Sequence, residues 1–384
     1  MRRWACLLPL LAAAYRVTGK RLYLDELGAQ LRHWIAANPV ELGPNWACTM
    51  DVAIRSANWV AALALCAEQA GEEPWFTETL ESLLLHGRFI RAHPEDGDVR
   101  GNHYLADLVG LLPVAALFSG GWVGRDWAQW ATGELASEME HQVRGDGCAH
   151  EASVPYHRLV TELFICGTQA ADALDPNRFA HWYREQLDAM LGFVAGYTRP
   201  DGLAPQIGDG DDGRFLPLDD YGRRDPRDHR HLFEQAGRAY ESEKSHRAFP
   251  EGGFFVLRDD DLYAVVRCGD TGRFASTASG SYPASHGTSS CCGEAGRDAS
   301  TPRVGARGIA SFHSVSSSNA NAPPCSSDDG AGALWAGGGD SGSGSDLSHA
   351  GSSSSGAARR CICGAEGAGG AECPSLSPPP RSVS

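Results

Sequence analysis

Two short polar clusters interrupt an otherwise helical and apolar stretch of the sequence. The first is Gly101-Asn102-His103-Tyr104, and the second runs from Glu151 to His157 and contains Ser153 and Tyr156. An amide, a phenol and imidazoles within one helical framework are the groups needed to remove an acidic carbon-bound proton and release an adjacent oxygen. The two clusters therefore favour an enzyme that works by elimination over a binding module.

Apolar periodicity predicts a succession of helices joined by short turns, from Trp4 to about Leu191 and slightly beyond. The expected helices cover residues 4–15, 22–35, 51–68, 77–90, 104–118, 127–143, 157–174 and 179–197. Paired helices with short links are typical of an α-solenoid or an α/α toroid. Two expected strands follow, at 253–258 and 262–267, on either side of a run of three aspartates. This β-hairpin predicts the beginning of a second domain.

The composition changes after Arg273. More than half of residues 274–384 are Ser, Gly or Ala, and such a segment cannot bury enough apolar surface to offset the entropy of ordering. We expect a disordered tail. It is either native or the product of a frame shift in GC-rich coding sequence, and the frame shift is favoured because a hairpin that stops after two strands is not a stable terminus.

Charge and cysteine content narrow the class of partner. A formal net charge of -15 argues against nucleic acid, although local Arg and Asn groups can still line a cleft for a polyanionic sugar. The twelve cysteines show no complete metal-site spacing, and Cys48 is expected to be a buried apolar thiol like the other cysteines of the helical segments. The sequence thus predicts no metal and no cofactor. An acidic loop with Asp209, Asp211 and Asp212 is expected to be a solvated turn rather than a calcium site.

The N-terminus has two interpretations. Arg2-Arg3 followed by the apolar run Trp4–Ala14 has the look of a signal peptide, but the helical spacing of its apolar residues favours a helix inside a domain. No apolar run reaches the eighteen or so residues of a membrane span, so none is expected.

Five motifs that occur in the same order resemble those of the heparinase II/III family of polysaccharide lyases. They are Gly43–Trp46, Ala53–Trp59, Gly101–Asp107, Glu151–Arg158 and the segment Pro205–Arg214. The resemblance spans roughly Trp4 to Arg267. It implies a mainly α fold, in which an α/α toroid, incomplete at its N-terminus, precedes the start of an antiparallel β-sandwich. The expected divisions are 1–215 toroid, 216–248 linker, 249–273 first sandwich strands and 274–384 tail.

The resemblance also implies site residues. Asn102 matches the neutral donor that holds the substrate carboxylate in an enolate-like form. Tyr156 matches the tyrosine that acts as acid and in some members as base, and His103 is a neighbouring candidate for positioning or proton transfer. The substrate-binding candidates are Asn45, Trp46, Arg55, Asn58 and His157.

Each of these residues also has an ordinary structural interpretation. Asn102 could cap the helix that follows it, and Tyr156 could be a core tyrosine. Arg55 could pair with a substrate carboxylate or with Asp51 one turn earlier. The family's sandwich histidine has no match, because His286 and His313 lack its motif. The resemblance therefore implies a lyase that could be inactive in this form.

The implied function is β-elimination on a uronic-acid-containing polysaccharide, either heparin- or heparan-sulfate-like or alginate-like. One alternative is a glycoside hydrolase on the same architecture with Asp107 and Glu151 as its carboxylates. The other is a non-catalytic carbohydrate-binding remnant. The expected partner is an acidic polysaccharide or oligosaccharide, and the oligomeric state stays open. The resemblance implies a periplasmic or cell-envelope location, or a cytoplasmic one if no signal peptide lies upstream.

Overall fold

The computed structural model describes residues 2–97, 100–218, 223–259, 262–269 and 290–296. Most of the expected tail, residues 274–289 and 297–384, lies outside the described residues, and so do His286 and His313. The boundaries proposed between domains therefore stay predictions.

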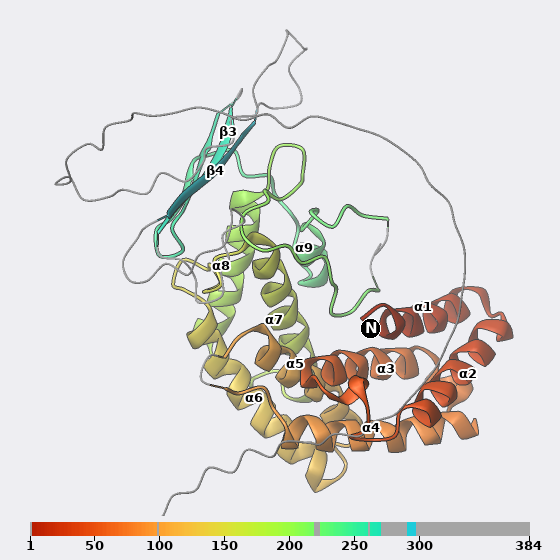
Figure 1. Cartoon of the computed structure of the whole chain (residues 1–384). Helices are drawn as coiled ribbons and strands as arrows, with labels where there is room; N and C mark the ends of the chain where they lie inside the picture. Colours follow the sequence, from red (N-terminus) through yellow and green to blue (C-terminus); the bar gives the residue numbers. More distant parts are fainter. Residues whose placement is uncertain (1, 98–99, 219–222, 260–261, 270–289, 297–384) are drawn as a thin grey trace, which may run out of the picture. The chain divides into compact units, whose positions relative to one another are not determined.

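Eight long helices make up most of the described chain (Figure 1). They are α1 (Arg2–Thr18), α2 (Arg21–Ala37), α3 (Thr49–Ala70), α4 (Pro74–Ala92), α5 (Asn102–Leu117), α6 (Trp122–Gln142), α7 (Val154–Leu174) and α8 (His181–Tyr197). The odd-numbered helices pack against one another in chain order, α2 packs against α4, and α6 packs against α8. An inner and an outer layer of alternating helices form an incomplete α/α toroid, so the prediction of a mainly α fold is confirmed.

The composition of each helix explains its layer. In α5, 11 of 16 residues are buried, and in α3, 15 of 22, so these helices are enclosed on all sides. By contrast, α2 buries only Leu24, Leu27, Gly28 and Leu31, which form one stripe at helical spacing. Helices α3 and α5 are thus held by apolar packing around most of their circumference, and α5 carries the first polar cluster on its first turn.

Helix α3 combines a length of 22 residues with an apolar composition. Among the described helices, it alone is long and apolar enough to cross a bilayer, contrary to the expectation that no segment would qualify. However, 67% of its most apolar window is buried inside the protein. The length and apolar composition of α3 are therefore also those of a core helix, since α3 packs against α1, α4 and α5.

The close approach of α5 to α3 depends on Gly110. A Cβ at this position would lie 2.4 Å from the carbonyl oxygen of Ala53 on α3. We expect Gly110→Ala to lower the free energy of unfolding by about 1–3 kcal/mol, because neither backbone can yield without repacking. Gly133 on α6 is exposed and has no atom within 4 Å of its would-be Cβ, so Gly133→Ala should instead stabilise the protein by about 0.5–1 kcal/mol. Urea unfolding of both variants tests this, and equal effects would contradict the proposed contact.

Shorter elements follow the helices. A 3-10 turn, η1 (Pro44–Trp46), precedes α3, and α9 (His231–Gln235) lies within the segment expected to be a linker. One antiparallel sheet has the order β1 (Arg247–Phe249), β2 (Phe254–Arg258), β3 (Tyr263–Gly269) and β4 (Ser290–Gly296). The predicted hairpin is confirmed as β2 and β3. Strand β4 lies within residues 274–384, the segment expected to be a disordered tail, and pairs with β3 along its whole length.

The sheet packs against α8 through a second hydrophobic core. Alternation along β2 buries Phe254 and Val256, and Phe254 packs against Phe193 of α8 with ring centroids 5.0 Å apart. The buried guanidinium of Arg258 donates to the carbonyl of Thr198 at 2.5 Å. These contacts fix the C-terminal end of α8 to the sheet.

Candidate active site

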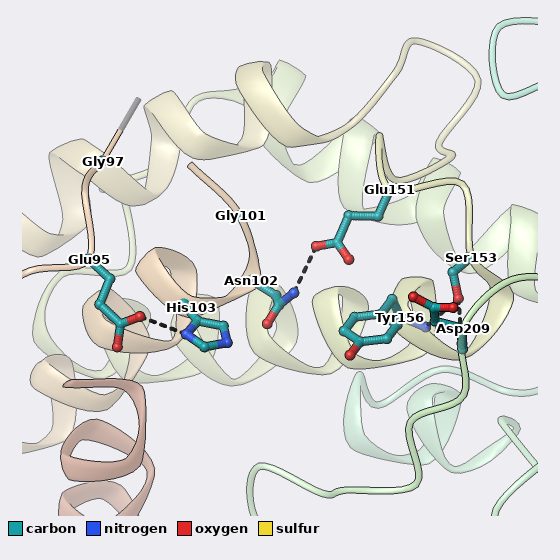
Figure 2. Close-up of a pocket in the computed structure, with 9 residues that line it drawn as sticks. All are labelled: Glu95, Gly97, Gly101, Asn102, His103, Glu151, Ser153, Tyr156 and Asp209. Carbon is teal, nitrogen blue, oxygen red and sulfur yellow. Dashed lines mark hydrogen bonds and ion pairs between the residues drawn. The ribbon is translucent and has the colours of Figure 1, made fainter. Parts of the chain in front are cut away.

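A cavity of about 510 Å³ lies where the loops before α5 and α7 meet (Figure 2). Its lining residues are Glu95, Gly97, Gly101, Asn102, His103, Glu151, Ser153, Tyr156 and Asp209. The three predicted catalytic residues, Asn102, His103 and Tyr156, therefore share one cavity although they come from two different helices.

Two helix N-termini supply the framework of the cavity. Helix α5 begins at Asn102 after the extended Gly101, and α7 begins at Val154 after Ser153. The first backbone N–H groups of a helix lack intrahelical partners and carry partial positive charge. Both cavity walls are thus suited to a negatively charged group.

Asn102 is the first residue of α5 and not its cap. The N-cap is Gly101, and no side chain caps this helix, so the interpretation of Asn102 as a cap does not hold. Its Nδ2 instead donates a hydrogen bond of 2.9 Å to Oε1 of Glu151. Glu151 is buried, and the loss of solvation raises the pKa of its carboxyl, while the bond from Asn102 acts in the opposite direction. The contact fixes the direction of the Asn102 amide.

The backbone after Glu151 is strained. Ala152 has a φ of 57°, in the left-handed region that side chains with a Cβ rarely adopt. Such conformations persist where the surrounding structure holds them, and they are common at functional sites. The turn at Ala152 directs the buried Glu151 toward Asn102.

His103 is held in a charged pair. Its Nδ1 lies 2.6 Å from Oε2 of Glu95, and Oε1 of Glu95 accepts from the backbone N–H of Met50 at 3.0 Å. Hydrogen bonds with Cys48 and Glu95 raise the pKa of His103 to about 10, so the imidazole carries a proton on each nitrogen at neutral pH. The side chain is 50% exposed, which leaves Nε2 able to donate to a bound anion.

Tyr156 occupies the first turn of α7. Ser153 caps this helix by accepting from the N–H of Tyr156 at 3.3 Å, and its hydroxyl donates to the carbonyl of Asp209 at 2.8 Å. The segment before Asp209 lies directly against the cap, because Gly208 has a φ of 84° and a Cβ there would be 2.7 Å from Cα of Ser153. Tyr156 is half-buried in the cavity wall and is not enclosed in the core.

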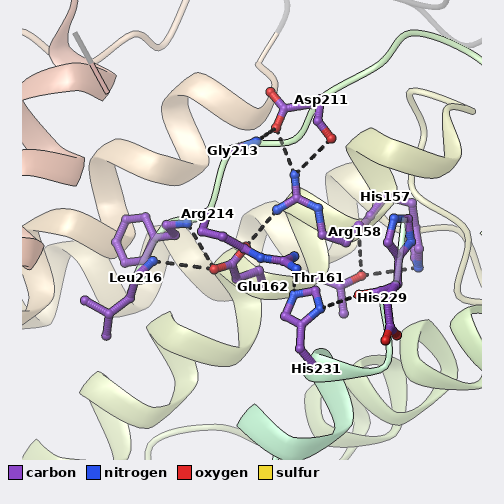
Figure 3. Close-up of polar contacts among 12 residues, drawn as sticks. His157, Arg158, Thr161, Glu162, Asp211, Gly213, Arg214, Leu216, His229 and His231 are labelled. Carbon is purple, nitrogen blue, oxygen red and sulfur yellow. Dashed lines mark hydrogen bonds and ion pairs between the residues drawn. The ribbon is translucent and has the colours of Figure 1, made fainter. Parts of the chain in front are cut away.

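A buried ion pair fixes the segment after Asp209 to α7 (Figure 3). Arg158 donates to Glu162 and to Asp211, each at 2.8 Å, and Arg158 and Glu162 have no exposed surface. Asp211 also accepts from the N–H of Gly213 at 2.8 Å, and Glu162 accepts from that of Phe215 at 3.0 Å. The expectation of a solvated turn is thus wrong for Asp211, whose carboxylate is a structural partner of Arg158.

The other predicted binding residues do not line the cavity. Arg55 is buried on α3, where its guanidinium lies 4.3 Å from the centre of the Trp34 ring and donates to His86 at 3.1 Å and to the carbonyl of Asn45 at 3.2 Å. Burial lowers the pKa of Arg55 to about 9. Trp46 is buried beside the same His86.

Asn58 is also interior. It has no exposed surface, and its amide donates to the carbonyls of Ile54 and Phe215, each at 2.8 Å. The Asn58 amide thus connects α3 to Phe215, which lies shortly after Asp211, the ion-pair partner of Arg158. The contacts of Arg55, Trp46 and Asn58 hold the first helices together, and roles for them in substrate binding stay predictions.

His157 faces the core behind Tyr156. Its Nδ1 accepts from the N–H of Ala149 at 3.3 Å, and its Nε2 lies 3.2 Å from the carbonyl oxygen of Met190, which requires a neutral ring with the proton on Nε2. Burial lowers the pKa of His157 to about 4.

The depressed pKa of His157 predicts loss of stability in acid. Above pH 6.5 the ring is neutral in both the folded and unfolded states, whereas between pH 6.5 and about 4 only the unfolded state takes up the proton. The stabilisation is therefore present near pH 7 and is lost as the pH falls through this range. We expect urea unfolding of His157→Gln to depend less on pH between 7 and 4 than wild type. His181→Gln, at an exposed helix start, should keep the wild-type dependence, and equal slopes for all three proteins would refute the assignment.

One residue of the cavity lining, Glu95, and one residue next to it, Cys48, carry no signal in the sequence. Glu95 sits in a polar turn, and Cys48 precedes a helix by one residue, so neither has a periodicity that points to a site. Only the packing of α3, α4 and α5 brings their side chains to His103.

Residues 3–217, more than half of the chain, match the family model described as Heparinase II/III N-terminus. A curated heparin-sulfate lyase of Pedobacter heparinus is 24% identical over 206 residues, which cover 52% of this chain and 31% of that protein.

Solved structures of heparinases are similar to this chain in fold. The heparan sulfate lyase of Pedobacter heparinus has a TM-score of 0.51 at 20% identity and is matched over 74% of this chain and 47% of its own. A crystal structure of heparinase III has a TM-score of 0.56 at 17% identity, over 73% and 47%. The chain thus spans about half the length of these solved relatives and about a third of the curated one.

Proposed function

Because the chain belongs to the heparinase II/III family, we propose that it acts as a polysaccharide lyase at the cavity of Asn102, His103 and Tyr156. The reaction is β-elimination on a uronic-acid-containing polysaccharide. The observation that carries this proposal is the meeting of an oriented amide, a cationic imidazole and a phenol around one cavity at two helix N-termini.

The chemistry assigns a task to each group. The proton on C5 of a uronate becomes acidic only when the adjacent carboxylate is neutralised, and Asn102 with His103 supplies donors for that carboxylate. Tyr156, acting as a phenolate, takes the proton from C5, and the electrons of the broken C5–H bond form the C4–C5 double bond. The C4–O bond breaks, and the resulting phenol passes its proton to the leaving oxygen. No water is consumed, and the new end carries an unsaturated sugar.

The local charge supports an anionic substrate in spite of the net charge of -15. The negative charge of Glu95 is offset by His103, and desolvation favours the neutral form of Glu151. The two helix N-termini add partial positive charge. Two of the three carboxyl groups in the lining, those of Glu95 and Glu151, therefore oppose the entry of a substrate carboxylate less than free anions would.

The substrate class we propose first is a heparin- or heparan-sulfate-like polymer, since the named relatives are lyases of heparin sulfate and heparan sulfate. None of these named relatives supports the alginate option. Because these relatives are 24% identical or less, they indicate which substrates to test first and do not assign a substrate to this chain.

The hydrolase alternative loses support from the position of its carboxylates. Glu151 lines the cavity, but Asp107 has no exposed surface, does not line the cavity and accepts from the N–H of Glu95 at 2.8 Å. A pair of these two carboxylates could not flank one glycosidic bond.

The proposal is tested by mixing the full chain with heparin, heparan sulfate, a non-sulfated uronate polymer and a neutral polysaccharide. We expect the ultraviolet absorbance of an unsaturated uronate to rise with at least one acidic polymer and not with the neutral one. Binding without this absorbance would favour the carbohydrate-binding alternative, and no response to any acidic polymer would overturn the proposal.

A further inference from the structure

Three side chains of different chemistry converge at one end of the cavity. The Sγ of Cys48, a carboxylate oxygen of Glu95 and a ring nitrogen of His103 all lie within 4.8 Å of one another. They come from the residue before α3, the loop after α4 and the first turn of α5. Cys48 is half-buried, contrary to the expectation of a buried apolar thiol, whereas Cys66 and Cys148 are buried as expected.

We propose that Cys48, Glu95 and His103 form a zinc-binding site. Thiolate, imidazole and carboxylate are zinc ligands, whereas calcium and magnesium prefer oxygen alone. Zinc bonds of about 2.0–2.3 Å in a tetrahedron place ligand atoms roughly 3.3–3.7 Å apart. Sγ of Cys48 lies 3.3 Å from Oε1 of Glu95, and His103, with Nδ1 2.6 Å from Oε2, needs only a small outward movement of a half-exposed ring.

The carboxylate in the middle is already fixed in place. Glu95 is held by its own N–H, which donates to Oδ2 of Asp107 at 2.8 Å, and by the N–H of Met50, which donates to its Oε1 at 3.0 Å. Ligands that are oriented by such outer contacts bind metal more tightly than free side chains. The three protein ligands leave a fourth tetrahedral position for water from the cavity.

Asp107 gives a second and independent indication of a missing group. Its side chain has no exposed surface, and its Oδ1 has no hydrogen-bond partner among the described residues. A buried acceptor without a partner is rare, and an ordered water or ion commonly satisfies it. Asp107 lies one helical turn after His103 on α5, so a zinc ion and its water would sit close to this part of the helix.

Zinc at this site changes the chemistry of the cavity. Binding requires the thiolate of Cys48 and an unprotonated Nδ1 of His103, so both protons leave to solvent. The ion occupies the nitrogen that pairs with Glu95 and ties down the ring that would face a substrate carboxylate. If the proposed lyase activity is present, zinc inhibits it and a chelator restores it; that consequence alone rests on the proposed function.

Cobalt(II) titration of the full chain tests the site without any substrate. Cobalt replaces zinc in such sites, and a cobalt–thiolate bond gives a charge-transfer band in the near ultraviolet. Because the chain has twelve cysteines, the decisive quantity is the one equivalent of bound cobalt that disappears in Cys48→Ser. The matched control is Cys166→Ser, a half-buried cysteine of α7 outside the cavity lining, which should keep it.

Zinc competition against bound cobalt then gives affinities. We expect Cys48→Ser and Glu95→Gln each to weaken zinc binding by more than about 100-fold, since loss of mere outer-shell contacts already weakens it by about 10–100-fold. Circular dichroism confirms that each variant is folded, and Glu95→Gln serves if the cysteine variant is not. A chain that binds no cobalt, or folded variants that bind zinc as tightly as wild type, would overturn the site. Failure of lyase activity would leave this measurement unaffected.

Discussion

Tyr156→Phe should lower kcat of the lyase reaction by about 10²–10⁴-fold, because it removes the group that transfers protons at the reacting carbon and the leaving oxygen. The ring remains, so Ser153 still caps α7 and the cavity keeps its wall. Substrate binding through Asn102 and His103 should persist. We therefore expect KM to change far less than kcat when unsaturated product is followed by absorbance.

Tyr23→Phe is the matched control for this variant. Tyr23 lies half-buried on α2, an outer helix that contributes nothing to the cavity lining, and the substitution removes the same atom. It should leave kcat unchanged. A Tyr156→Phe protein with circular dichroism and kcat equal to wild type would show that the phenol takes no part in the reaction.

Asn102→Asp should reduce kcat/KM by at least about 10³-fold, the upper end of the effect of losing one donor to a developing oxyanion. The replacement also places a second carboxyl at the 2.9 Å contact with Glu151. Two carboxyl groups at this distance cannot both be ionised, so one proton is shared and held to higher pH. The negative charge that remains near the substrate carboxylate makes the loss larger than removal of the amide alone.

The pH dependence of Asn102→Asp separates the effect of the added negative charge from the effect of the lost amide donor. As the pH falls, both carboxyls become protonated and the new side chain can donate a hydrogen bond, so the defect of Asn102→Asp should shrink in acid. Asn102→Ala has no donor at any pH and should show no such recovery. Asn177→Asp, at an exposed loop position, adds the same charge elsewhere and should behave as wild type. Equal pH profiles for Asn102→Asp and Asn102→Ala would refute the assigned role.

Apolar periodicity predicts that these helices exist but does not predict the residues at which they begin. The prediction placed the start of α5 at Tyr104 and that of α7 at His157, whereas the helices begin at Asn102 and Val154. The first turn of α5 is polar because Asn102 and His103 face the cavity, and α7 begins with Val154 and Pro155 directly after the Ser153 cap, so apolar periodicity misses both starts. The meeting of these two helix starts is what brings Asn102, His103 and Tyr156 together.

The motifs mixed residues of the site with residues of the core. Arg55 and Asn58 lie in a motif as specific as that of Asn102, yet they are buried and bond to His86 and to the carbonyl of Phe215. Sequence spacing could not separate these cases, because both kinds of residue are polar and sit on inner helices. Glu95 and Cys48 were missed because their meeting depends on how three helices pack.

The measurement that tests the central claim most directly is the fate of solvent oxygen. The full chain is incubated with the acidic polymer that responds, in water enriched in heavy oxygen, and the fragments are weighed by mass spectrometry. Elimination predicts that one fragment from each cut carries an unsaturated uronate, and that heavy oxygen enters the new reducing end no faster than it exchanges into an ordinary reducing sugar kept in the same water. Heavy oxygen that enters a new reducing end faster than this exchange, without unsaturation, would contradict the lyase mechanism and show hydrolysis instead.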